Sequence, residues 1–217
     1  MNVYAFYEPL DYYAYVHEDQ KKLIELWKKS WSHYGWNPIV YGIKECEESE
    51  DFKAVYDSCE NLPTINHKKY ELYCFLRWLY MSKVGGWYAD LDMINYGFTP
   101  LECNGKTATA SLGLQCSCFH MSTDGYKAVI ETLKNLKESD SKYNAMVNGK
   151  KHFSDMYVLS NFKDIKIKLN IQKEFMSIGY KNAKIVHYHF GMYNNPNCVG
   201  RTRTQVILED PRTKAFL

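Results

Sequence analysis

The residues best suited to chemistry are two aspartates near the middle of the chain, within residues 85–94 (GGWYADLDMI). A strand over residues 87–94 would project Asp90 and Asp92 from the same side of the backbone, because successive strand residues alternate. Two carboxylates this close repel each other unless a cation lies between them. Carboxylate oxygens suit Mg²⁺ or Mn²⁺. The pair therefore predicts a divalent metal site, and the alternative is that the acids cap turns or pair with surface lysines.

Strand and helix patterns before this segment describe how the acids are positioned. Residues 2–7 (NVYAFY) and 37–41 (NPIVY) read as short buried strands, and residues 18–34 between them carry apolar side chains at helical spacing. This order predicts a parallel pair in one sheet. A buried helix over residues 67–84 then ends at a Gly-Gly pair. The acids follow at the carboxyl end of a strand, where open α/β sheets bind their ligands.

The rest of the chain continues the same alternation, and residues 1–217 are expected to form a single α/β domain with a mostly parallel central sheet flanked by helices. Residues 45–60 are expected to form a surface helix or loop, and the last residues a loop and a short helix. The other expected elements are strands over 106–113, 114–121, 165–171 and 183–190, and helices over 124–137 (capped by Ser122 or Thr123) and 154–161.

The segment 76–92 (LRWLYMSKVGGWYADLD) resembles the motif of the DXD-containing sugar transferases, which have a GT-A type, Rossmann-like fold. This family includes yeast-type initiating α-1,6-mannosyltransferases and bacterial capsule and toxin-type transferases. The matching residues are Arg77, Gly85, Gly86, Tyr88, Asp90 and Asp92. The chain departs from the motif at Cys74, where the family has an aspartate. In its compact size the chain also resembles small glycosyltransferases encoded by large DNA viruses of algae.

The resemblance implies a role for each matching residue. Asp92 binds the metal directly, and Asp90, also a catalytic candidate, touches the donor ribose or the metal through water. Arg77 pairs with the first acid or with the donor; the alternative is an exposed helix charge. Gly86 and Tyr88 belong to the same donor site.

Two histidines near the end of the chain, in residues 185–191 (IVHYHFG), resemble the element that closes this family's metal site. His187 is the matching ligand and His189 lies on the same strand face. Imidazole with two carboxylates suits Mn²⁺ better than Mg²⁺. Gly191 allows the backbone to approach a phosphate. The alternative is that each histidine is an ordinary core residue.

Three further candidates lie elsewhere. Tyr7 ends the first strand, the usual place for a base contact in this fold class, with Tyr12 and Tyr13 as alternatives. Asp155 resembles the acid that faces the sugar in retaining relatives, and its alternative role is a helix cap. Arg201 and Arg203 are expected to be charges of the C-terminal tail, although they could also fold over a diphosphate.

Composition narrows the class of protein. The formal net charge is +2 and no polybasic block occurs, so nucleic acid is not an expected partner. No stretch of the sequence is apolar enough for a membrane segment, no signal peptide is visible at the start, and the seven cysteines have no paired spacing. These features favour a reducing, cytoplasmic setting, and the viral resemblance implies a virus-encoded protein that acts in the host cytoplasm.

We therefore expect metal-dependent transfer of a sugar, with retention, from a nucleotide-sugar donor to a glycan, glycoprotein or other hydroxyl acceptor. A UDP-sugar is favoured as donor, and a GDP-sugar follows. One alternative is a phosphatase of the haloacid dehalogenase type, in which the first aspartate of such a pair is the nucleophile. Another is a non-catalytic module that binds a nucleotide-sugar.

Overall fold

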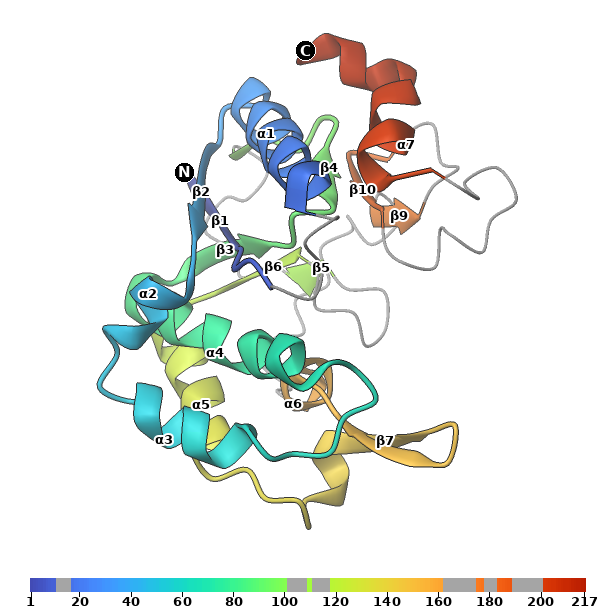
Figure 1. Ribbon diagram of the computed structural model, residues 1–217. Helices are drawn as coiled ribbons and strands as arrows, with labels where there is room; N and C mark the ends of the chain where they lie inside the picture. The colour runs from blue at the N-terminus through green and yellow to red at the C-terminus, as the bar shows by residue number, and fades with distance from the viewer. Residues whose placement is uncertain (11–16, 101–108, 111–117, 162–174, 178–182, 189–200) are drawn as a thin grey trace.

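The computed structural model describes residues 1–10, 17–100, 109–110, 118–161, 175–177, 183–188 and 201–217 (Figure 1). The expected strand over residues 165–171 lies outside these residues. So do four of the candidates named above: Tyr12, Tyr13, His189 and Gly191.

A five-stranded sheet forms the centre of the molecule, and its first half follows the expected β-α-β order. β1 (Asn2–Phe6) pairs in parallel with β2 (Asn37–Tyr41), and α1 (His17–His33) connects the two. β3 (Gly86–Ala89) lies parallel to β1 on its other side. β6 (Cys118–Met121) then runs antiparallel between β3 and the short edge strand β5 (Thr109–Ala110). The order is β2-β1-β3-β6-β5, and four of the five strands point the same way, which confirms a mixed α/β fold with a mostly parallel sheet.

The prediction of one continuous strand over residues 87–94 is wrong. β3 ends at Ala89, and β4 (Met93–Asn95) belongs to a second sheet of order β4-β10-β9, with β10 (Ile185–His187) and β9 (Phe175–Ser177). The Met93 backbone N–H donates to the Asp90 carbonyl at 2.9 Å, which closes a turn around Leu91 and Asp92. Both strands are buried, so their apolar residues run together in the sequence and conceal the turn between them.

Helices cover both faces of the central sheet. α4 (Lys68–Val84) packs with α2 (Ile43–Glu47), α3 (Phe52–Cys59) and α5 (Thr123–Lys134), whereas α1 packs with α7 (Arg203–Glu209). Successive residues of β3 alternate between these two layers: Trp87 joins the core under α1, and Tyr88 joins the core under α4. The segment expected to be a surface helix or loop, residues 45–60, forms most of the two helices α2 and α3. The helices α4 and α5 lie close to their expected positions, and Ser122 caps α5 as expected.

One element has no counterpart in the sequence-based expectation, the hairpin of β7 (Asn144–Val147) and β8 (Lys150–Phe153). Its turn residues Asn148 and Gly149 both have positive φ, which is the conformation that an Asn-Gly hairpin turn requires. A 3₁₀ helix (η3, Ser141–Tyr143) precedes the hairpin and α6 (Asp155–Ser160) follows it.

The described residues 201–217 contain the expected short helix, α7, followed by a 3₁₀ turn (η7, Pro211–Ala215), whereas most of the expected loop lies outside the described residues. This C-terminal part lies next to α1 and the second sheet (Figure 1). Among the described residues, no helix is both long and apolar enough to cross a membrane.

Candidate functional site

The Gly-Gly pair turns the chain from α4 into β3 and so delivers the aspartates to the sheet edge. Gly85 has φ 62° and ψ −172°, and Gly86 has φ 94°. Conformations like that of Gly85 are essentially restricted to glycine. A Cβ at Gly85 would also lie 3.1 Å from both the Thr123 backbone nitrogen and its methyl carbon. The two glycines therefore serve the backbone path from α4 into β3.

Arg77, on α4, is the hub of the site. Its Nη1 donates to the Tyr88 hydroxyl at 2.8 Å and to Asp90 Oδ1 at 2.9 Å. Its Nε and Nη2 donate to Asp155 Oδ2 at 3.1 and 2.7 Å. The Arg77 side chain is 12% exposed, so these charge-assisted bonds are largely shielded from water. Pairing of Arg77 with the first acid is confirmed and the alternative of an exposed helix charge is wrong, whereas a contact of Arg77 with the donor stays a prediction.

Asp90 is held from two sides through one oxygen. The Tyr88 hydroxyl donates to the same Asp90 Oδ1 at 2.8 Å that Arg77 contacts. Burial raises the pKa of Asp90, Arg77 opposes this shift, and the neighbouring Asp92 adds to it. Tyr88 is itself buried, so it contacts Asp90 from beneath the sheet edge. This arrangement fixes the orientation of the carboxylate.

Asp155 reaches the site from α6, near the end of the described segment 118–161. Besides Arg77, the Trp78 indole N–H donates to its Oδ2 at 3.0 Å, and the residue is 2% exposed. Ser154 caps the helix, with its hydroxyl accepting from the Met156 backbone N–H at 3.4 Å. The alternative of Asp155 as the cap is therefore wrong, and its role towards a sugar stays a prediction.

Asp92 lies on the other side of the turn and faces a different set of residues. His187 Nε2 is 3.3 Å from Asp92 Oδ1, because β10 pairs His187 with Met93 next to the turn. Arg203 Nη1 is 3.5 Å from Asp92 Oδ2. Burial acts to raise the pKa of Asp92, but His187 and then Arg203 outweigh it and hold the pKa below its usual range.

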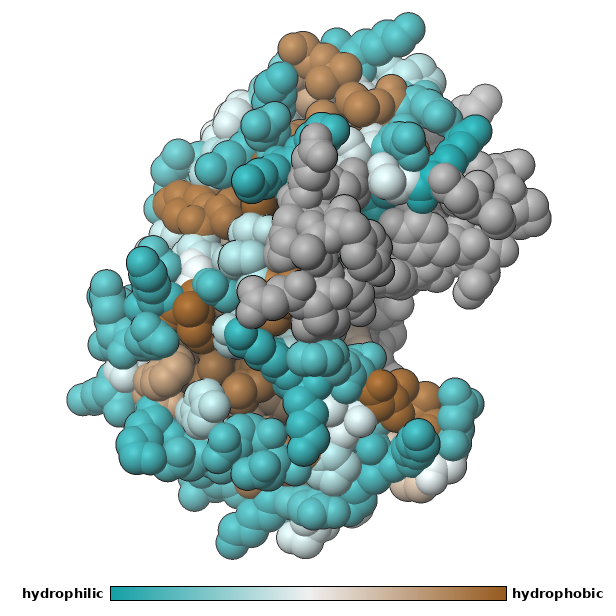
Figure 2. All heavy atoms as spheres, in the orientation of Figure 1, coloured by the Kyte–Doolittle hydropathy of each residue, from teal (hydrophilic) through white to brown (hydrophobic). Residues whose placement is uncertain are grey.

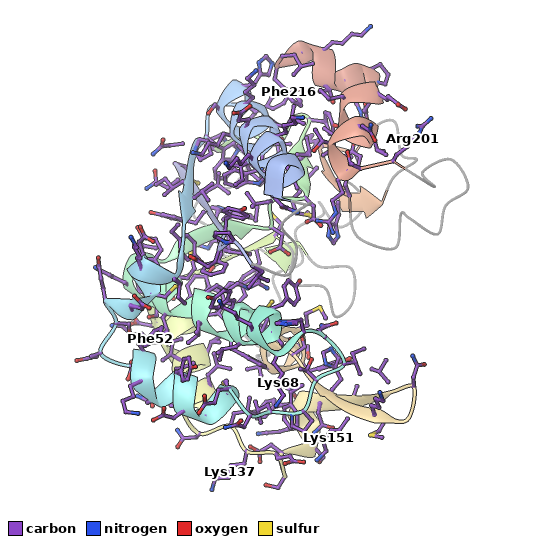
Figure 3. The ribbon with its side chains drawn as sticks, in the orientation of Figure 1. Phe52, Lys68, Lys137, Lys151, Arg201 and Phe216 are labelled. Atoms are coloured by element: carbon purple, nitrogen blue, oxygen red, sulfur yellow. The ribbon has the colours of Figure 1, made fainter. Side chains whose placement is uncertain are left out.

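The position of Arg203 corrects its assignment as a tail charge. Its side chain is 14% exposed and lies at the start of α7, facing Asp92. Arg201, in contrast, pairs with Glu209 at the surface and points away from the molecule (Figure 3), as a tail charge does. The packing of α7 gives the two arginines different partners. The sequence around them does not show this difference, so it could not predict which arginine faces Asp92.

The residues around Asp92 were tested for their fit to a divalent cation. Asp92 Oδ1 is buried and accepts no well-directed hydrogen bond from a described residue, although His187 lies beside it as an ion-pair partner. Within the described ranges, no group of three or more acid, histidine or cysteine side chains is assembled as a metal cage. Asp92 and His187 together fit a cation that takes few protein ligands and completes its shell with phosphate oxygens and water.

Tyr7 emerges at the same edge of the sheet as Asp90, because β1 and β3 are parallel with Tyr4 beside Tyr88. Its backbone N–H donates to the Tyr41 carbonyl at 2.9 Å, and its side chain is half-buried against the core under α1. Tyr7 thus stands beyond the last residue of β1, at the edge that carries the aspartates. Its contact with a base stays a prediction.

The sequence reasoning did not include Glu71, a buried acid next to Asp155. Glu71 is 3% exposed, and its Oε2 accepts from the Asn66 amide at 2.7 Å. Burial, and then the charge of Asp155, raise the pKa of Glu71 to about 7. Its signal was an acid on the apolar face of α4, seven residues before Trp78.

A comparison of the chain with models of protein families and with curated proteins finds no match.

Proposed function

We propose that this chain transfers a sugar from a nucleotide-sugar donor in a metal-dependent reaction, at a GT-A type site. The observation that carries the proposal is the turn between the two sheets. It presents Asp90 and Asp92 together, one fixed by Arg77 and Tyr88, the other facing His187 and Arg203. Two adjacent acids with separate cationic partners suit a ligand that brings both a metal ion and a diphosphate.

Asp92 and His187 are the residues that would hold the cation, with Asp90 beside them. A bound Mn²⁺ or Mg²⁺ supplies charge neutralisation for the leaving diphosphate. Asp90 uses Oδ1 for its two internal hydrogen bonds, which leaves Oδ2 for a ribose hydroxyl or a water of the cation. In this proposal, Asp90 Oδ1 makes the internal hydrogen bonds and Oδ2 binds the donor.

Arg203 complements this arrangement because it brings a positive charge to Asp92 Oδ2. A guanidinium there can bind phosphate oxygens through two N–H groups. It therefore suits the diphosphate of the donor. Asp155 remains our candidate for the sugar side through its bonds to Arg77, and retention of configuration is the proposed outcome. A UDP-sugar is the favoured donor, with a GDP-sugar next and a glycan or other hydroxyl as acceptor.

The test is release of free nucleotide from UDP-glucose, UDP-galactose and GDP-mannose, with Mn²⁺ and with a chelator. The proposal predicts metal-dependent release from one donor, and loss of that release in Asp92→Asn. Asp57→Asn is the matched control, because Asp57 is an exposed aspartate on α3 that pairs with Lys53 at the surface. Release of phosphate from an aryl phosphate, without nucleotide release, would instead support the phosphatase. Binding of a donor without turnover would support the non-catalytic module.

A further inference from the structure

We propose that Tyr70 forms a stacking platform for a pyranose ring of the acceptor, at the inner end of an apolar rim that also contains Ile65 and Met146. This inference rests on the proposed function, since it assigns the acceptor side of the same site. Three independent features of the structure support it: the position of Tyr70 on α4, the exposure of its ring, and the distribution of exposed apolar residues.

Tyr70 lies on the same ridge of α4 as the hub of the site. Tyr70, Cys74 and Arg77 are spaced i, i+4 and i+7, so their side chains follow one face of the helix. At about 1.5 Å per residue, Tyr70 is about 10 Å from Arg77 along the axis. That is more than the width of one sugar ring. If the donor sugar lies next to Arg77, the sugar ring over Tyr70 therefore belongs to the acceptor.

The two ends of the Tyr70 side chain have different surroundings. The residue is 47% exposed, an unusual exposure for an aromatic residue of a largely buried helix. Yet Cys74, and then burial, raise the pKa of Tyr70, with Arg77 opposing and Asp90 contributing. The side chain thus combines exposed surface with electrostatic contact to Cys74 and Arg77. A ring with a polar end suits a sugar, whose C–H face packs on the aromatic ring and whose hydroxyls bind at its edge.

Two further exposed apolar side chains lie on segments near the start of α4. Among the described residues away from the ends of the chain, the exposed large apolar side chains are those of Tyr56, Ile65, Tyr70, Met146 and Leu208. Three of the five lie on the segment before α4, on the first turn of α4 and on the β7–β8 hairpin. Figure 2 shows apolar atoms at this edge of the molecule, beside the hairpin.

Hydrogen bonds join two of these segments, the hairpin and the segment before α4. The Phe153 backbone N–H donates to the Pro63 carbonyl at 2.8 Å, and the Thr64 hydroxyl lies 3.1 Å from His152 Nδ1. The hairpin is thereby attached to the chain that leads into α4. In Figure 3 the labelled Lys68 and Lys151 mark the start of α4 and the hairpin at this edge. In this proposal, further sugars of an oligosaccharide acceptor would lie along the hairpin and the segment before α4.

The experiment measures binding of three simple glycosides to the full chain by saturation-transfer NMR, in the presence of UDP and Mn²⁺. The probes are methyl β-D-glucopyranoside, methyl β-D-galactopyranoside and methyl α-D-mannopyranoside. Tyr70→Ala should weaken binding of a glycoside by about tenfold, and Tyr70→Phe should retain it because the ring remains. Tyr56→Ala, which removes another exposed tyrosine on α3, is the control and should bind as the wild type does.

The same samples separate failure of this inference from failure of the proposed function. Glycoside binding that is unchanged in Tyr70→Ala, or absent from the wild type, would overturn the acceptor platform. So would a loss of UDP binding in Tyr70→Ala, since the ring would then contact the base or donor. If instead the wild type binds neither UDP nor GDP in the presence of Mn²⁺, the proposed function fails, whatever the glycosides do.

Discussion

Arg77 shares one positive charge between two carboxylates on different elements, Asp90 after β3 and Asp155 on α6. Its guanidinium also lies 4.5 Å from the Trp78 ring centre and 5.0 Å from that of Tyr88. A planar fork with several donors suits this position, and a lysine would make fewer of these contacts. Because the group is buried, loss of Arg77 would leave two carboxylates without their cation.

Arg77→Met is therefore expected to lower the free energy of unfolding by about 3–5 kcal/mol, the usual cost of breaking a buried ion pair from one side. Lys83→Met is the control on the same helix. Lys83 pairs with Glu48 at the surface, where both side chains are more than half exposed. That pair is expected to contribute less than about 1 kcal/mol. Urea unfolding of both variants measures the difference, and equal losses would contradict the assigned role of Arg77.

Glu71 makes stability depend on pH. Its pKa rises from the ordinary value of 4.5 to about 7 in the folded chain, mainly through burial. The folded state thus holds the Glu71 proton more tightly than the unfolded state. The stabilisation is complete below about pH 4.5, and it is lost as the pH rises through about 7.

Glu71→Gln keeps the shape and the bond to Asn66 but cannot ionise, so it should escape this loss. Compared with the wild type, the variant is expected to be more stable at about pH 8 by up to about 3 kcal/mol, and nearly equal at about pH 5. Urea unfolding at the two pH values measures this. Glu25→Gln, exposed on α1, should show no such change between the two. A Glu71→Gln effect of the same size at both pH values would refute the linkage.

At the scale of elements, the junction of α4 and β3 depends on its two glycines in different ways. Both have positive φ, but a Cβ at Gly85 meets Thr123 at 3.1 Å, whereas a Cβ at Gly86 has no neighbour closer than 3.9 Å. Gly85 also has the more restricted backbone conformation. The path of the chain into the aspartate turn therefore depends chiefly on Gly85.

Gly85→Ala is expected to destabilise the fold by about 1–3 kcal/mol from backbone strain alone, with the contact to Thr123 added. Gly86→Ala should cost less because its Cβ has room. Thermal unfolding of the two variants provides the comparison. Equal losses, or a larger loss for Gly86→Ala, would show that the contact with Thr123 does not matter.

The sequence predicts the elements well where one face is buried and a clear stop follows. Four elements lie within a few residues of their expected positions: β1, α1, β2 and α4. Helical spacing of the apolar residues identifies the two helices, and Gly85 identifies the end of α4. The strand over residues 87–94 failed because two buried strands adjoin without a polar break. The hairpin was missed although Asn148 and Gly149 are a recognised turn pair, because its flanking strands are polar and short.

At the scale of the whole molecule, the site is assembled from segments far apart in the chain. The DXD-like segment itself contains Arg77, Tyr88 and Asp90, and the resemblance implied that Arg77 pairs with the first acid or with the donor, of which the structure contains the first contact. The pairing of Arg77 with Asp155 spans 78 residues, and that of Asp92 with Arg203 spans more than 100. Such contacts depend on how α6 and α7 pack, which local pattern does not encode.

The most direct test of a metal-diphosphate site is thermal stability of the wild type with UDP, GDP and CDP, each with and without Mn²⁺. A ligand at about a hundred times its dissociation constant adds about 2.7 kcal/mol. Such a rise is expected for one nucleotide, only when Mn²⁺ is present, and it should be lost in Asp92→Asn but not in Asp57→Asn. If no nucleotide with Mn²⁺ stabilised the wild type, or if Asp92→Asn were stabilised equally, Asp92 would not hold a metal-diphosphate site.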